Sequence, residues 1–217
     1  MDYLLFVIDI LSYVIPIILL IGTVMGFLVY RQFKTNRFIK LMFFLFFLSI
    51  LNDLFSRITP VYFDSNLIFI NTYSLVELII LYLYLKNAFI EEKKVFKHVF
   101  VLLVLFNIFE FFTVDFHDYL YYQSYSKSLN SLFLLIVSIF LILSYIKLDR
   151  FENVNRVLFL LPIYLTINSL IGLPLNLLIN YVDESVYYIW MINTLNSLTF
   201  YSVLIFTTWK YGKTLKA

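Results

Sequence analysis

The sequence predicts an all-α integral membrane protein, a single domain over residues 1–217 that forms a polytopic bundle of seven transmembrane helices. Hydrophobic residues make up 62% of the chain and charged residues only 14%, whereas soluble domains are about half apolar and about a quarter charged. The mean hydropathy is +0.90. The apolar residues also fall into seven stretches separated by short polar segments, and each stretch is long enough for a helix to cross a bilayer.

The expected helices take their limits from the charged and polar residues at the ends of each apolar run. They cover residues 3–30, 38–56, 68–85, 95–114, 124–146, 157–180 and 186–209. The segments between them are short, so we expect no attached soluble domain. The first stretch has neither a basic region before it nor a small-residue cleavage site after it, and we expect a retained helix there rather than a signal peptide.

Basic residues gather in alternate loops, which predicts the orientation. Of the 16 lysines and arginines, 14 fall around the first, third and fifth loops and in the tail: Arg31, Lys34, Arg37, Lys40, Lys86, Lys93, Lys94, Lys97, Lys147, Arg150, Arg156, Lys210, Lys213 and Lys216. The other loops hold Asp64, Asp115, Asp118, Asp183 and Glu184. Because cytoplasmic loops are enriched in Lys and Arg, we expect an outside amino terminus and a cytoplasmic carboxyl terminus in a bacterial inner membrane.

The third stretch contains the most costly residue of the predicted bundle. One line of polar residues interrupts its apolar sequence: Asn71, Ser74 and Glu77. Glu77 lies near the middle of the span, where a carboxylate is expensive in lipid. Other helices must therefore supply a polar environment for this side chain.

Polar residues on the other helices concentrate toward the predicted outer side. Those in the outer half are Asp53, Asn71, Asn107, Glu110, Lys127, Asn130, Asn176 and Asn193, and those nearer the middle are Glu77, Asn168 and Asn196. The inner halves of most helices are almost purely apolar. This asymmetry predicts a polar pocket that opens outward and is closed by an apolar plug. The candidate ligand-binding residues are Glu77, Glu110, Asn71, Asn107, Asn168, Asn196, Lys127 and Asp53.

A purely structural role is the alternative for these residues. Asparagine and serine side chains often hold membrane helices together, at about 0.6 kcal/mol per hydrogen bond. Glu110 and Lys127 could satisfy each other as an ion pair. Asp53 has a ready partner in Arg57, four residues further along the same helical face.

The first stretch has a different character because it contains the pair Gly22 and Gly26. This G-x-x-x-G spacing allows another helix to approach closely. Packing inside the bundle is one consequence of such a pair, and a homodimer formed through Gly22 and Gly26 is the alternative.

Several kinds of chemistry have no residues to support them. The chain has no cysteine and only two histidines, so we expect no metal site and no cofactor. The last stretch has no lysine before Lys210 that could carry a retinal Schiff base. A net charge of +2 is too small to indicate nucleic acid as a partner.

One local pattern resembles a known group of proteins. Asn52 and Asp53 in the second stretch, followed by Asn71 and Glu77 in the third, form a pattern similar to that of small uncharacterised seven-helix integral membrane proteins of Bacteroidota. The resemblance covers these two stretches. It implies a seven-helix membrane protein and brings no activity with it.

Together these features predict a non-enzymatic sensor or regulatory module. It would bind a small ligand or a lipid in the outward-facing pocket and act on a cytoplasmic protein partner through its basic inner loops. A small-solute or proton-coupled transporter, with Glu77 as its protonation site, is the alternative. An intramembrane enzyme that modifies a lipid, with Glu77 and Glu110 as paired carboxylates, is a further alternative.

Overall fold

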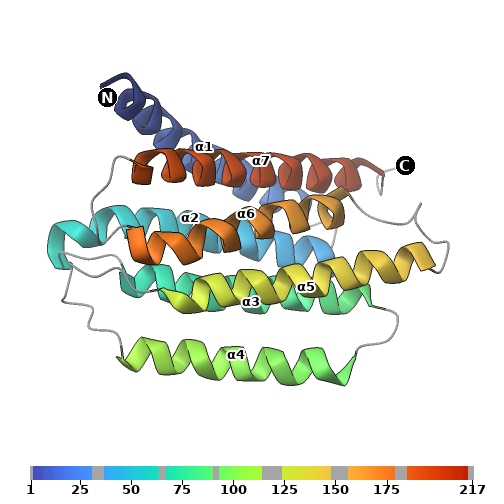
Figure 1. The fold of residues 1–217 in the computed structure, drawn as a ribbon. Coiled ribbons are helices and arrows are strands. Elements are labelled where there is room, and N and C mark those ends of the chain that lie inside the picture. Colours follow the sequence, from blue (N-terminus) through green and yellow to red (C-terminus); the bar gives the residue numbers. More distant parts are fainter. Residues whose placement is uncertain are drawn as a thin grey trace.

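The computed structural model describes residues 2–30, 37–63, 67–89, 93–113, 124–147, 156–178 and 185–214. These residues form seven helices and no strand, so the predicted all-helical fold is confirmed (Figure 1). The helices are α1 (Asp2–Tyr30), α2 (Arg37–Phe63), α3 (Leu67–Ala88), α4 (Lys94–Thr113), α5 (Tyr125–Lys147), α6 (Arg156–Leu178) and α7 (Ser185–Thr214).

Three of the helices are long and apolar enough to cross a membrane over their described residues. These are α3, α4 and α5. Shorter apolar helical segments, Tyr13–Leu28 and Val157–Ile171, lie in α1 and α6. The protein is therefore a helical protein with segments suited to a bilayer.

The largest difference from the predicted boundaries is at the end of α2. The expected helix ended at residue 56, whereas α2 continues to Phe63. Arg57 lies inside this extension, and its guanidinium Nε donates a 2.9 Å hydrogen bond to Asp53 Oδ2 one turn earlier. The apolar run ended just before Arg57, but the helix continues beyond it, because a polar pair spaced four residues apart is compatible with a helix.

Successive helices run in opposite directions, so the bundle has two distinct ends (Figure 1). One end holds the first residues of the even-numbered helices and the last residues of the odd-numbered ones. Its described basic residues are Lys40, Lys86, Lys93, Lys94, Lys97, Lys147 and Lys210, and we call it the basic end. Among the loop charges used to predict orientation, Arg31, Lys34, Arg150, Lys216, Asp64, Asp115, Asp118, Asp183 and Glu184 lie outside the described residues.

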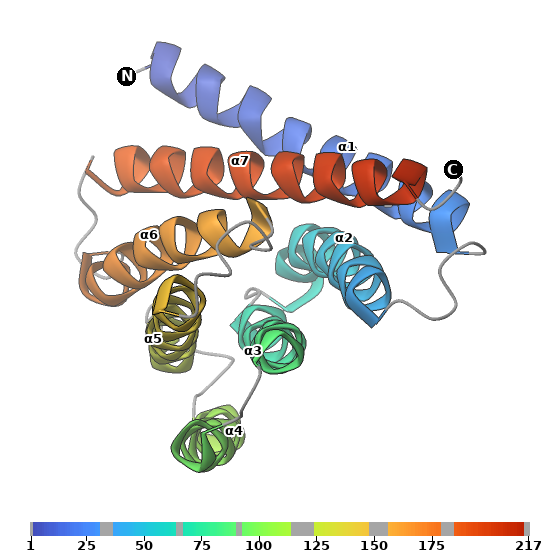
Figure 2. The same cartoon turned by 90° about the vertical axis from the view of Figure 1, so that its right-hand side faces the viewer.

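The helices form a layered arrangement. α1 and α7 pack together and cover α2 and α6, which in turn contact α3 and α5. In Figure 2, α3, α4 and α5 are seen nearly end-on, whereas α7 is seen lengthwise and α1 slants across it. α4 lies at the opposite side from α1 and contacts α3 and α5. The buried residues of α4 are Asn107 and Glu110. Most of the surface of this helix therefore faces away from the bundle.

Gly22 and Gly26 lie on the face of α1 that packs inside the bundle. A Cβ atom at Gly22 would lie 2.7 Å from Phe46 Cδ1 and 3.1 Å from Ile205 Cγ1. A Cβ atom at Gly26 would lie 2.5 Å from Phe43 Cδ2. Both glycines therefore permit close contact with α2, and Gly22 also with α7. The packing alternative has direct contacts in this chain, and the homodimer stays a prediction.

Candidate functional site

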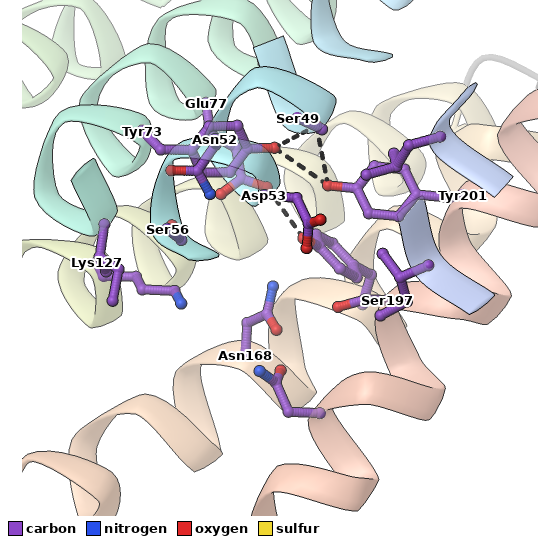
Figure 3. A pocket seen from close by; sticks show the side chains of 15 residues that line it. Ser49, Asn52, Asp53, Ser56, Tyr73, Glu77, Lys127, Asn168, Ser197 and Tyr201 are labelled. Carbon is purple, nitrogen blue, oxygen red and sulfur yellow. Dashed lines mark hydrogen bonds between the residues drawn. The ribbon is translucent and has the colours of Figure 1, made fainter. Parts of the chain in front are cut away.

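A polar pocket lies between six of the helices, with α4 excluded. Its volume is about 290 Å³, which is at the small end of the range for ligand sites. The pocket is on the side of the bundle away from the basic end, where α2 and α6 finish and α3, α5 and α7 begin. Its lining consists of Ile15, Leu19, Ser49, Asn52, Asp53, Ser56, Ile70, Tyr73, Glu77, Lys127, Tyr164, Asn168, Asn193, Ser197 and Tyr201 (Figure 3).

Helical spacing explains how α2 and α3 line this space. Ser49, Asn52, Asp53 and Ser56 follow one another at intervals of three, one and three residues, so they share one face of α2. On α3 the pocket residues Ile70, Tyr73 and Glu77 recur at intervals of three and four. Each helix thus turns one polar stripe toward the same cavity.

Each of the two carboxylates in the lining has an assigned partner. The Asp53 carboxylate accepts hydrogen bonds from Arg57 Nε at 2.9 Å and Nη2 at 3.4 Å. This confirms the Asp53–Arg57 contact that the spacing predicts. The Glu77 side chain is 9% exposed, and its Oε1 accepts a 3.0 Å hydrogen bond from the Tyr164 hydroxyl. The Tyr164 ring stacks on Phe200 with centroids 4.1 Å apart, which fixes the position of that hydroxyl.

Three hydroxyl groups close the pocket beside Glu77. Ser49 Oγ lies 2.6 Å from the Tyr73 hydroxyl oxygen and 3.2 Å from that of Tyr201. The two tyrosine oxygens are 3.1 Å apart. Ser49 also donates to the Leu45 carbonyl at 2.7 Å. This triangle joins α2, α3 and α7 at the bottom of the cavity.

Below this triangle, toward the basic end, large apolar side chains dominate the core, with Thr23, Ser138, Thr207 and Thr208 as buried polar residues among them. We call the following fully buried side chains the apolar layer: Leu45, Phe46, Leu81, Leu85, Leu141 and Leu161. They come from α2, α3, α5 and α6, and each precedes or follows its helix's pocket residues on the basic-end side. The described helices therefore pack on this side of the cavity mainly through large apolar side chains.

Lys127 and a group of amides line the remaining wall. Lys127 extends its amino group into the cavity from α5, toward Asn168 (Figure 3). No direct ion pair joins it to Glu77 or Asp53. Asn196 lies behind this wall, where its Nδ2 donates to the Tyr164 carbonyl at 3.0 Å and to Asn168 Oδ1 at 3.4 Å. Asn196 therefore positions Tyr164 and Asn168 and does not itself line the cavity.

Glu110 is not in the pocket, which corrects the prediction that it joins Glu77. Its Oε1 accepts a 2.7 Å hydrogen bond from the Tyr125 backbone N–H, and its Oε2 accepts a 3.0 Å bond from that of Ser126. The carboxylate thus caps the amino terminus of α5, where free N–H groups and the helix dipole favour a negative charge. The alternative of an ion pair between Glu110 and Lys127 is not formed in the described residues, because the backbone of α5 is the partner of Glu110.

Asn107 likewise belongs to a contact between helices. Asn107 Nδ2 donates to Asn130 Oδ1 at 3.0 Å, and Asn130 Nδ2 donates back to Asn107 Oδ1 at the same distance. Asn130 Nδ2 also lies 2.9 Å from Ser74 Oγ. These three residues join α4, α5 and α3, which supports the alternative that asparagines hold helices together.

Asn71 is buried, with 5% of its surface exposed, and lies outside the pocket lining. Both polar atoms of its amide lack a hydrogen-bond partner among the described residues. The predicted residue Asn176 is in α6, and its side chain lies outside the described part of the chain. The structure therefore brings Asp53, Glu77, Lys127 and Asn168 together in one cavity and leaves Asn71, Asn107, Glu110 and Asn196 out of its lining.

Sequence reasoning missed the tyrosines. Tyr73, Tyr164 and Tyr201 surround Glu77 in the structure, but the chain has 18 tyrosines and composition does not single out these three. One signal was present for Tyr73, which is four residues before Glu77 on the same face of α3. A similar spacing relates Asn193 and Ser197 on α7.

The described residues contain no group of three side chains able to hold a metal ion. No protein-family model, curated protein or solved structure matches this chain. The geometry of the pocket is therefore the basis for the function proposed below.

Proposed function

We propose that all seven helices cross a bacterial inner membrane, with the basic end in the cytoplasm. The lengths of α1 and α7, which cross the other helices at an angle, support this arrangement. α1 has 29 residues and α7 has 30, which corresponds to about 45 Å of helix for each. A tilted helix of that length covers a hydrocarbon core of about 30 Å. The distribution of Lys and Arg supports the orientation.

The exposed apolar side chains also fit a lipid environment. On α4, Leu102 is 64% exposed and Phe112 is 81% exposed. On α1, Leu28 is 65% exposed. Such a surface would be unfavourable in water over a large contiguous area, whereas lipid tails surround it without cost.

Within this membrane protein, we propose that the pocket is the binding site of a sensor or regulatory module. The observation that carries this proposal is the position of the cavity above the apolar layer. A molecule that enters from outside would reach Lys127, Asn168 and Glu77 and would meet fully buried leucines and Phe46 beyond them. This arrangement suits binding better than passage through the protein.

The proposed contact with a cytoplasmic protein would be made at the basic end. Lys93, Lys94 and Lys97 are exposed around the start of α4, and α3 connects this end to the pocket through Glu77 and Tyr73. A ligand that repositions α3 would change the presentation of these lysines. We propose that a cytoplasmic protein with an acidic surface reads this change.

A bulky side chain placed in the pocket tests the binding function. We expect Ser197→Trp to abolish retention of a molecule that co-purifies with the protein, because the indole fills the cavity. Ser202→Trp is the matched control, since Ser202 is exposed on the same helix. Mass spectrometry of the purified proteins measures the retained small molecules and lipids.

Two outcomes would contradict this function. Equal retention by Ser197→Trp and the control would show that the pocket is not the binding site. Flux of the retained compound into proteoliposomes, lost in Glu77→Gln while binding persists, would replace the sensor with the transporter. The lipid-modifying alternative relied on Glu77 and Glu110 as paired carboxylates, and Glu110 is engaged at the start of α5 instead. The other carboxylate of the lining, that of Asp53, is paired with Arg57.

A further inference from the structure

The charges in the pocket divide into one compensated pair and two groups without a direct ionic partner. Asp53 is paired with Arg57. Lys127 forms no ion pair with any described residue. Glu77 is bonded through Oε1 to a neutral hydroxyl, that of Tyr164. A positive and a negative group therefore face the same cavity, and neither is neutralised by direct contact.

Lys127 and Glu77 reach the cavity from different helices, α5 and α3. Both residues line the cavity, and their side chains form no ion pair with each other. Lys127 enters from the side of Ser56 and Asn168, and Glu77 enters from the α3 side with Tyr73 (Figure 3). Glu77 is buried, whereas Lys127 is only half-buried. A buried carboxylate without a cationic partner is costly, so an ammonium group that reaches Glu77 stabilises it, and Lys127 offers a second charge to an anion.

Neutral polar groups lie beside these two charges. Asn52 Oδ1 and Ser56 Oγ are shielded from solvent and have no hydrogen-bond partner in the described part of the chain. Both residues line the cavity, as do the amides of Asn168 and Asn193. Buried polar atoms are normally hydrogen-bonded, so Asn52 and Ser56 retain hydrogen-bonding capacity that the described residues leave unused.

We propose that the pocket binds a small zwitterion, with an ammonium group at Glu77 and a carboxylate or phosphate at Lys127. This inference rests on the proposed binding function and names its ligand class. A cavity of about 290 Å³ accommodates a free α-amino acid. The headgroup of phosphatidylethanolamine carries the same pair of charges, an ammonium and a phosphate. The shared chemistry is a primary amine and an anion separated by a short linker.

The first part of the test uses ligand analogues. The purified protein is placed in phosphatidylglycerol nanodiscs, and its melting temperature is measured with each common α-amino acid, with the hydroxy acid that lacks the amine, and with the amide that lacks the carboxylate. We expect stabilisation by at least one complete zwitterion and by neither of its analogues. The lipid arm compares nanodiscs of phosphatidylethanolamine, N-acetylated phosphatidylethanolamine and phosphatidylglycerol. Stabilisation by unmodified phosphatidylethanolamine alone would identify the lipid as the source.

The second part assigns each charge to its residue. Lys127→Met should weaken binding of the zwitterion by roughly tenfold or more, and it should remove the advantage of the anionic group. Glu77→Gln should remove the advantage of the amine instead. Lys127→Arg keeps the charge and should retain binding, and Lys97→Met, at an exposed position of α4, should bind like the unaltered protein. Melting without ligand shows whether each variant is folded.

The failures of the two proposals are distinguishable. Equal binding of a zwitterion and its amine-free analogue to the unaltered protein would overturn the zwitterion and leave a binding pocket for anions. No response to any amino acid or to phosphatidylethanolamine would also overturn the zwitterion. In that case, loss of a different co-purified molecule in Ser197→Trp would still support the binding function, whereas unchanged retention would overturn both.

Discussion

Replacing Glu110 with alanine should lower the free energy of unfolding by about 2–3 kcal/mol, because two backbone donors at the start of α5 lose a charged acceptor. The carboxylate lies 2.7 Å from the Tyr125 nitrogen and 3.0 Å from the Ser126 nitrogen. Glu110 is 5% exposed, so water does not readily replace it. Unfolding in mixed micelles, followed by circular dichroism, measures the change.

Two controls separate capping from a role in binding. Glu110→Gln keeps one acceptor oxygen and should cost about half as much as alanine. Thr113→Ala removes an exposed hydroxyl from the same helix and should have little effect. Loss of ligand retention in a fully stable Glu110→Ala protein would contradict the structural role and return Glu110 to the site.

Gly22→Val should destabilise the protein by about 3 kcal/mol, through overpacking. The first added carbon atom would lie 2.7 Å from Phe46 Cδ1. The Phe46 side chain is 0% exposed, so its ring has no free space into which it could move. The same unfolding measurement applies. Leu20→Val is the matched control on the exposed face of α1 and should change stability by a few tenths of a kcal/mol.

This variant also distinguishes the two alternatives for the glycine pair. If Gly22 permits packing inside the chain, the substitution lowers stability at every protein concentration. A dimer interface predicts a different result, in which Gly22→Val converts a dimer to a monomer while the unfolding of the monomer is unchanged. Analytical ultracentrifugation in detergent separates these outcomes.

Most of the fold could be predicted from hydropathy alone, because long apolar runs between charged loops leave few alternatives to helices. The exception at the end of α2 has a clear cause. The polar residue Arg57 follows the end of the apolar run, but it pairs with Asp53 one turn earlier, and this four-residue spacing stabilises a helix that continues past both. Hydropathy indicates which part of a helix favours a lipid environment. The helix itself ends where its backbone hydrogen bonds end.

The candidate site was predicted only in part, because depth in the bundle does not determine which way a side chain points. Glu77 and Glu110 have the same chemistry and both are buried, yet one faces the cavity and the other reaches a helix terminus across the α4–α5 connection. The environment of each carboxylate depends on which helices are neighbours in space. A single sequence does not specify these neighbours. The tyrosine and serine hydroxyls around Glu77 were missed for the same reason.

Thiol labelling tests the central claim, which is that the pocket opens to the outside above a closed apolar layer. The chain has no cysteine of its own, so single cysteines can replace Ser197 and Asn168 in the pocket, Ser74 in the contact between α3 and α5, and Leu161 in the apolar layer. Tyr188→Cys is the exposed control near the start of α7. Intact cells are treated with a membrane-impermeant maleimide.

We predict labelling at Ser197→Cys and Asn168→Cys at rates close to that of Tyr188→Cys, and none at Ser74→Cys or Leu161→Cys. Labelling of Tyr188→Cys alone would contradict the account, because it would mean that the polar residues form a closed core. Labelling of the pocket positions only after the cells are permeabilised would contradict the orientation.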